Sequence, residues 1–80
     1  HGSNTGPNLV HANLTGTDLS GANLSSGDLQ SAKLINTNLN DTNLSSVSLS
    51  DPTNSSGLIS NGGTTLPEGW LIVGGVLVSV

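Results

Sequence analysis

The chain has 80 residues, a formal net charge of −4 and a single Lys or Arg, and only 8% of its residues are charged. This length allows one small domain, and the absence of cysteine excludes disulfides and thiolate metal sites. One cation excludes ordinary nucleic-acid binding, which needs several basic side chains to neutralise phosphates. The longest apolar run, residues 70–80, is interrupted by two glycines and is too short to span a bilayer.

Leucine recurs at every fifth position through the first part of the chain. A period of five fits neither a helix nor a plain strand. The backbone must therefore turn once per repeat, so that each leucine points toward a common axis. We predict that these residues form the hydrophobic core. They are Leu9, Leu14, Leu19, Leu24, Leu29, Leu34, Leu39, Leu44 and Leu49.

The positions around each leucine support this interpretation. The residue two places earlier is small or of modest size, as in Ala12, Thr17 and Ala22, which suits a second inward-facing slot. The residue just before each leucine is polar, and Asn or Asp there favours turn conformations. The two residues after it are mostly Ser, Thr, Gly, Asn or Asp, and we expect them to face outward.

These units resemble the pentapeptide-repeat family, in which Ala is followed by Asp or Asn, then by Leu and two variable residues. Residues 12–16 and 22–26 match this pattern well, and the resemblance covers residues 7–51. It implies an all-β fold, a right-handed quadrilateral parallel β-helix or solenoid with one repeat per side and four repeats per coil. Neighbouring coils are then separated by about the strand spacing, ~4.8 Å.

Residues twenty positions apart should therefore stack in rows on the outer surface. We expect the rows Asn8 with Asp28 and Ser48, Asn13 with Lys33, Asp18 with Asn38, and Asn23 with Asn43. No two carboxylates share a row, which avoids repulsion between like charges on adjacent strands.

The repeat fails after Leu49, where Asn54 occupies the next leucine position. We expect residues 50–57 to be a loop or a weakened side. Ile59 falls back in register within a possible final strand at 58–60. The predicted β-helix domain therefore spans residues 1–60, with regular repeats at 7–51.

Residues 61–80 are predicted to be a β-hairpin or strand extension that joins copies. Asn61-Gly62-Gly63 signals a turn, residues 64–66 suggest a short strand, and Gly74-Gly75 between two β-rich runs is typical of a hairpin. No amphipathic capping helix is evident at either end, and open β-edges recruit other strands. The predicted assembly interface consists of Trp70, Leu71, Ile72, Val73, Val76, Leu77, Val78 and Val80. We expect Trp70 to anchor the hairpin against the last coil.

Part of this extension is similar to an insert between repeat blocks in some long pentapeptide-repeat proteins. The similarity lies in residues 66–70 and 75–77. Joining Val80 to residues 1–4 of a second copy would continue the pattern. We therefore expect the chain to be one unit of a tandem array, or to stack as if it were.

Residue types used in catalysis are present, but the repeat sets their spacing. His11 lies in a row with Ser31 and Asp51, without a positioned nucleophile and an orienting partner. We therefore expect no enzymatic activity and no cofactor. The coil aspartates lie in different rows, whereas a calcium site needs converging oxygens, so we also expect no metal. These aspartates are Asp18, Asp28, Asp41 and Asp51.

Three functions are compatible with these features. We expect a non-enzymatic structural protein that self-assembles by end-to-end stacking into a fibre or sheath, with itself as partner, in an extracellular or cell-surface location. Some pentapeptide-repeat proteins are acidic rods that mimic DNA and bind type II topoisomerases, but this coil is short for such a module. Ice binding ranks last, because hydroxyl rows such as Thr17 with Thr37 lack regular Thr-x-Thr strands.

Overall fold

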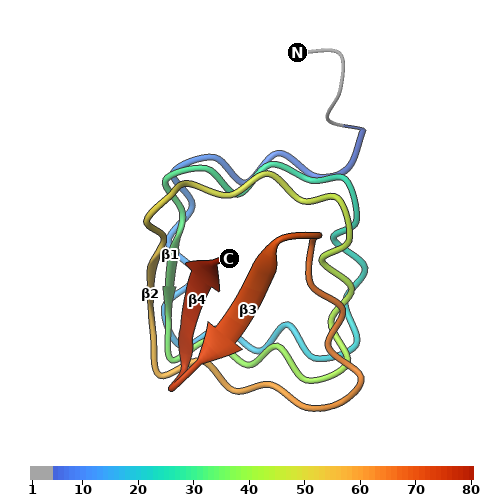
Figure 1. The fold of residues 1–80 in the computed structure, drawn as a ribbon. Coiled ribbons are helices and arrows are strands. Elements are labelled where there is room, and N and C mark those ends of the chain that lie inside the picture. The colour runs from blue at the N-terminus through green and yellow to red at the C-terminus, as the bar shows by residue number, and fades with distance from the viewer. Residues whose placement is uncertain (1–4) are drawn as a thin grey trace.

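The chain winds in stacked coils that are covered at one end by a hairpin (Figure 1). The computed structural model describes residues 5–80, so the expected continuation through residues 1–4 lies outside the described part. Residues 5–80 contain short strands and no helix. The strands are β1 (Lys33–Ile35), β2 (Asn54–Ser56), β3 (Trp70–Val73) and β4 (Val76–Ser79).

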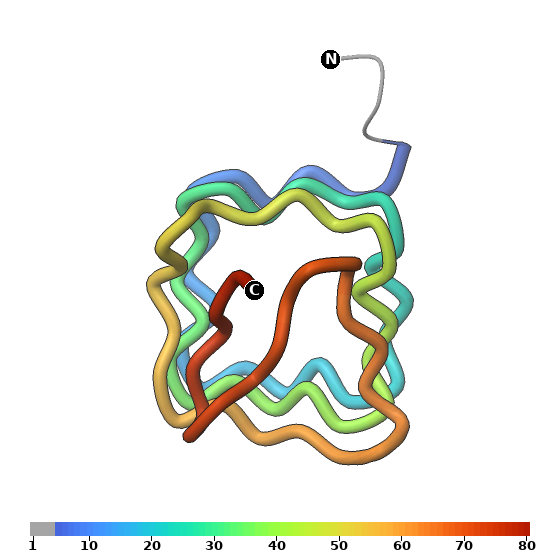
Figure 2. Tube along the Cα trace, viewed as in Figure 1, coloured from blue at the N-terminus to red at the C-terminus, as the bar shows by residue number. Residues whose placement is uncertain are grey.

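Consecutive coils pair in parallel, and their trace follows a square outline in Figure 2. We refer to residues 7–26 as the first coil, 27–46 as the second and 47–66 as the third. Residues twenty positions apart pair between the first and second coils and at the start of the third, so the predicted rows are confirmed. The pairs are Asn8 with Asp28, Asn13 with Lys33, Asp18 with Asn38, Asn23 with Asn43, and Asp28 with Ser48.

A left-handed residue forms each corner from residue 11 to residue 46, two positions after the leucine. The φ angles at these corners lie between 55° and 74°. Residues other than glycine rarely adopt this backbone conformation, yet only two of these corner residues are glycines. The corner residues are His11, Gly16, Gly21, Ser26, Ser31, Asn36, Asp41 and Ser46.

The polar residue before the leucine stabilises the corner that follows. In the first repeat, Asn8 Oδ1 accepts a hydrogen bond of 3.1 Å from the backbone N–H of Val10. Such an Asx turn explains the preference for Asn and Asp at this position. The same bond is made by Asn13, Asp18, Asn23, Asp28, Asn38 and Asn43. A short bridge followed by a left-handed corner therefore accounts for the five-residue period.

The third coil continues the stack in a shifted register. Lys33 pairs with Asn54, twenty-one positions later, because the corner before β2 has one additional residue. The leucine slot is thereby filled by Ser55, which lies opposite Leu34. The expected loop or weakened side at 50–57 therefore contains β2, which pairs with β1 along its full length and carries Ser55 in place of a leucine.

The register expected for Ile59 is wrong by one residue. Leu58 faces the core and is 8% exposed, whereas Ile59 is 49% exposed and bridges to Asn38 on the outer wall. No strand forms at 58–60 or 64–66 beyond isolated bridges. Thr65 pairs with Asn43, so the paired wall continues past the boundary expected at residue 60.

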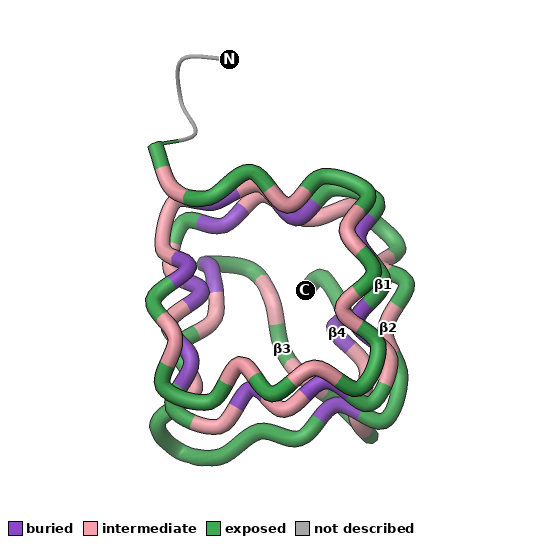
Figure 3. Tube along the Cα trace, turned by 180° about the vertical axis from the view of Figure 1, so that it is seen from behind, coloured by how far each residue is buried: buried purple, intermediate pink, exposed green. Residues whose placement is uncertain are grey.

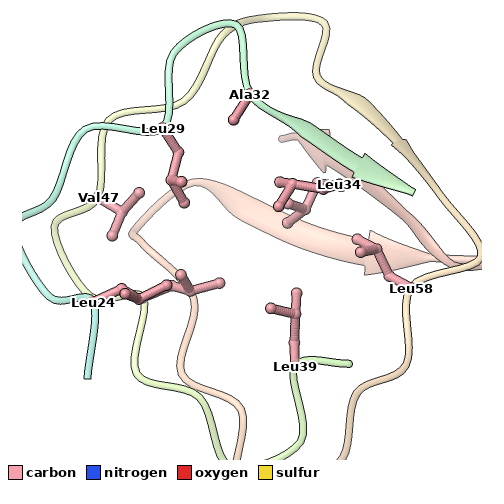
Figure 4. Packing of buried hydrophobic residues seen from close by; sticks show 9 residues of the cluster. Leu24, Leu29, Ala32, Leu34, Leu39, Val47 and Leu58 are labelled. Atoms are coloured by element: carbon pink, nitrogen blue, oxygen red, sulfur yellow. The ribbon is translucent and has the colours of Figure 1, made fainter. Parts of the chain in front are cut away.

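Apolar side chains from all sides fill the interior (Figure 4). The buried members are Leu24, Leu29, Ala32, Leu34, Leu39, Leu44, Val47, Leu58 and Leu77. The remaining repeat leucines, Leu9, Leu14, Leu19 and Leu49, are partly buried and pack against them. All nine predicted core leucines therefore lie in or against one cluster, and residues 5–80 enclose no detectable pocket.

The left-handed corners lead to a stability prediction. Gly16 has φ +69° and open space around its Cβ position, so Gly16→Ala introduces only the backbone penalty. We expect a loss of about 1 kcal/mol in the free energy of unfolding, measured by denaturant titration. The control is Gly62→Ala, which also has open space but no left-handed φ and should change stability little. Equal losses in the two variants would contradict the corner explanation.

Candidate functional site at the two ends of the coil

The C-terminal end of the coil is covered by the predicted hairpin, which is present in the structure. Gly74 and Gly75 form its turn with φ values of 57° and 78°. Two consecutive positive φ angles match the twist of the flanking strands, and glycine adopts them without strain. The register places Leu71 opposite Val78 and Ile72 opposite Leu77. Opposed residues share a face, so the hairpin has one face toward the coil and one away from it.

The inner face of the hairpin is bonded to the third coil. Leu77 is 2% exposed, its N–H donates to Ser55 Oγ at 3.0 Å, and its carbonyl accepts from Thr53 Oγ1 at 2.9 Å. Leu58 N–H donates to the carbonyl of Gly75 at 3.0 Å. The polar Ser55 in the leucine slot is therefore a docking point for β4. The hairpin therefore caps this end of the coil, whereas the sequence analysis considered only a helix as a cap.

The predicted assembly residues divide between the two faces of this hairpin. Trp70 and Ile72 are partly buried against the core, as is expected for an anchor. Val76 is half-buried. The outward side chains are apolar and exposed, with no charged residue from 70 to 80. They are Leu71, Val73, Val78 and the terminal Val80. We call these four residues the outer hairpin face.

Within residues 5–80, the N-terminal end of the core is only partly covered. In the second coil Leu34 and Leu39 are almost fully buried, whereas Leu14 and Leu19 one coil earlier are only partly buried. The burial colours in Figure 3, seen from the side opposite the hairpin, show the same change from intermediate to buried. The interior of the first coil is therefore more exposed at Leu14 and Leu19 than the interior of the second coil is at the equivalent positions.

Backbone groups along the first coil are also unpaired. Lys33 N–H donates to Ala12 O at 2.8 Å, and Lys33 O accepts from Leu14 N–H at 2.9 Å. The equivalent N–H and C=O of Asn13 have no hydrogen bond among residues 5–80. The same holds for Asn8, Asp18 and Asn23. An edge of unpaired N–H and C=O groups is a template for another strand.

Threonines in the second inward slot bond to the preceding coil on two sides of the stack. Thr37 Oγ1 donates to Leu14 O at 2.8 Å, and Thr42 Oγ1 donates to Leu19 O at 2.7 Å. Thr64 repeats the contact with Leu39 O at 2.6 Å. Thr17 occupies the equivalent slot in the first coil, and its hydroxyl has no partner among residues 5–80. The sequence analysis predicted only that a small side chain occupies this slot. It did not predict that a threonine hydroxyl there donates to a carbonyl of the preceding coil.

The side walls show no comparable site. Within residues 5–80 no group of three or more His, Asp or Glu residues is placed to hold a metal ion, and His11 is an exposed corner residue. Hydrogen bonds from the Ser20 hydroxyl and backbone N–H lower the pKa of the exposed Asp18 carboxyl. No helix long and apolar enough to cross a bilayer occurs in the described residues. The unusual surfaces are therefore the two ends.

Comparison with known proteins identifies the repeat. The family model for pentapeptide repeats matches residues 5–32 and 28–51, with eight copies. Together these matches cover more than half of the chain. Neither the curated proteins nor the solved structures gave a match.

The hydrogen bonds of these threonines can be tested with two variants. Thr42→Val removes one hydroxyl bond from Leu19 O, which retains the N–H of Ala22 at 3.0 Å. We expect Thr42→Val to lower the free energy of unfolding by about 1 kcal/mol. Thr17→Val removes a hydroxyl without a partner and should have little effect. A loss in Thr17→Val as large as in Thr42→Val would show that the inter-coil bond is not the cause.

Proposed function

Because the chain belongs to the pentapeptide-repeat family, we propose that it is a right-handed quadrilateral β-helix and serves as a non-enzymatic structural protein. In this proposal copies assemble end to end, with the outer hairpin face of one copy set against the first coil of the next. The observation that carries the proposal is that both axial ends of the stack formed by residues 5–80 present exposed apolar surface.

The shapes of the two ends support contact between copies. In Figure 2 the hairpin lies inside the square outline of the coils. Set against another copy, it would meet the partly buried leucines of the first coil, such as Leu14 and Leu19, rather than the walls. The unpaired backbone groups of Asn13 and Asp18 lie on those walls, where water can still reach them. The contact would therefore cover apolar surface without burying these polar groups.

Composition supports a second copy of this chain as the occupant. The side chains of the outer hairpin face carry no charge with which to select a basic or acidic partner. Contiguous exposed apolar surface marks an interaction site in soluble proteins, and each copy carries both halves of the contact. The two halves are different surfaces, so the contact is heterologous. A heterologous contact along one axis does not close and extends into a filament.

The outer hairpin face can be tested by one substitution and one matched control. Leu71 on this face is 51% exposed and Ile59 on the side wall is 49% exposed, so a lysine at either position should leave the fold intact. We expect wild type and Ile59→Lys to form fibres visible by electron microscopy, and Leu71→Lys to remain dispersed by light scattering. Circular dichroism checks that both variants are folded. Loss of fibres in both variants would point to lateral contacts and contradict end-to-end assembly.

Mixing variants distinguishes the proposed contact from one between two hairpins. Thr17→Lys places a charge at the open first coil, where the side chain is only partly buried. We expect Leu71→Lys and Thr17→Lys each to remain monomeric. Mixed together they should form a discrete dimer, because one intact end of each variant is complementary to the other. A dimer of Thr17→Lys alone would instead indicate a symmetric hairpin-to-hairpin contact.

The same measurements address the DNA-mimic alternative. A wild-type chain that stays a discrete dimer and binds a type II topoisomerase in a salt-sensitive manner would replace the structural proposal, because electrostatic association weakens as salt rises.

A further inference from the structure

The corner after the third side of the last coil holds an asparagine side chain in an unusual network. Asn61 Oδ1 accepts the backbone N–H of Asp41 at 3.0 Å and that of Gly63 at 3.0 Å. Asn61 Nδ2 lies 3.3 Å from Asp41 Oδ1, to which it donates. The amide carbonyl thus accepts from two backbone donors and, at 3.4 Å, from the Thr64 hydroxyl, while the NH2 group faces a carboxylate one coil below.

The next residue supplies a nucleophile beside this amide. Asn61-Gly62 is the only Asn-Gly pair in the chain. No atom lies within 4 Å of the Cβ position of Gly62, and its N–H makes no hydrogen bond among residues 5–80. The backbone nitrogen of a glycine lacks the steric shielding that a side chain on the same residue would impose. Every other asparagine precedes a residue with a side chain.

We propose that Asn61 is a self-modification site at which the chain converts its own amide into an acid. Gly62 N attacks Asn61 Cγ, the N–Cγ bond forms and the Cγ–Nδ2 bond breaks. The amide proton of Gly62 leaves with Nδ2 as ammonia, and the chain retains a succinimide. Water then opens this ring at either carbonyl, giving aspartate or isoaspartate at position 61. The only co-reactant is water, and no oxidation occurs.

The geometry of the corner favours this reaction in the folded chain. Attack on Cγ pushes negative charge onto Oδ1, which already faces the N–H groups of Asp41 and Gly63 at 3.0 Å. Donors at this distance stabilise developing charge in the manner of an oxyanion hole. These donors are backbone groups and need no rearrangement as the charge develops.

The product changes the corner from attraction to repulsion. The new carboxylate occupies the place of an NH2 group that donates to Asp41 Oδ1 at 3.3 Å. Two negative charges at such a distance repel each other. The Asp41 carboxylate has no room to move toward Gly63, because its Oδ1 already occupies the space that a Cβ on Gly63 would take. Conversion therefore loosens the attachment between the second and third coils at this corner.

The test uses the intact chain and its single tryptic site. Native wild type is incubated for weeks at neutral pH and cleaved after Lys33, the only Lys or Arg. Mass spectrometry of the 34–80 fragment should show first the succinimide, which has lost ammonia. It should then show the hydrolysed product, in which OH replaces the NH2 of the amide. Fragmentation assigns the change to position 61. Asn61→Gln should lack this product, and Gly62→Ala should form it severalfold more slowly, since a Cβ fits there but shields the nitrogen.

Two outcomes would overturn the proposal. Equal conversion in Gly62→Ala and wild type would show that Gly62 N is not the nucleophile. Conversion in urea-unfolded wild type but not in the native chain would show that the folded corner suppresses the reaction rather than supports it. Conversion that is at least as fast in the native chain as in the unfolded chain supports the proposal. None of these readouts depends on whether copies assemble.

Discussion

The backbone ladder between coils is the interaction on which the rest of this structure depends. Lys33 bonds to Ala12 and Leu14 through its own N–H and C=O, and the equivalent residues of the second coil repeat this exchange. A ladder whose rungs join residues twenty positions apart, as between the first two coils, requires five residues on each side. The left-handed corner and its Asx turn meet that requirement locally. The third coil keeps the ladder by taking up an additional residue at a corner. The leucines and threonines then add core contacts along an axis that the ladder has already set.

The two ends of the coil depend on the ladder in opposite ways. At the C-terminal end the chain departs from the repeat, and β4 replaces a further coil by bonding to Ser55 and Thr53. At the N-terminal end the ladder simply stops, which leaves Thr17 and the backbone of Asn13 without partners among the described residues. One end therefore has a specific cover with an apolar exterior, and the other keeps the features of an interior coil. This asymmetry is the basis for the proposed head-to-tail contact.

Much of the fold could be predicted from the sequence, because one residue type carries the periodicity. The spacing of Leu9 to Leu49 was sufficient to identify the repeat, the outer rows and the β character, and Gly74-Gly75 was sufficient to locate the hairpin. The third coil was harder. One added residue before β2 shifts the register, so that Leu58 rather than Ile59 lies in the core. No local sequence pattern predicts this shift.

The candidate site was less accessible to sequence reasoning than the fold. The apolar run at 70–80 identified the hairpin residues, but alternation alone does not reveal that Leu77 is covered while Val80 is exposed. Ser55 lies in the stretch expected to be a loop or a weakened side, and the sequence does not indicate that its hydroxyl lies beside the N–H of Leu77. The bond between Asn61 and Asp41 joins residues one coil apart, and the register shift conceals their proximity.

The constant spacing of the ladder also bears on how the chain folds. Every inter-coil bond joins residues about one coil apart, so no pair of rungs can form until a loop of that size has closed. The entropy of this first closure is the main kinetic cost. Each later coil adds to an existing edge and closes a loop of the same length, whatever the total number of coils. Folding of such a chain should therefore be limited by nucleation of the first pair of coils and be nearly independent of how many repeats follow.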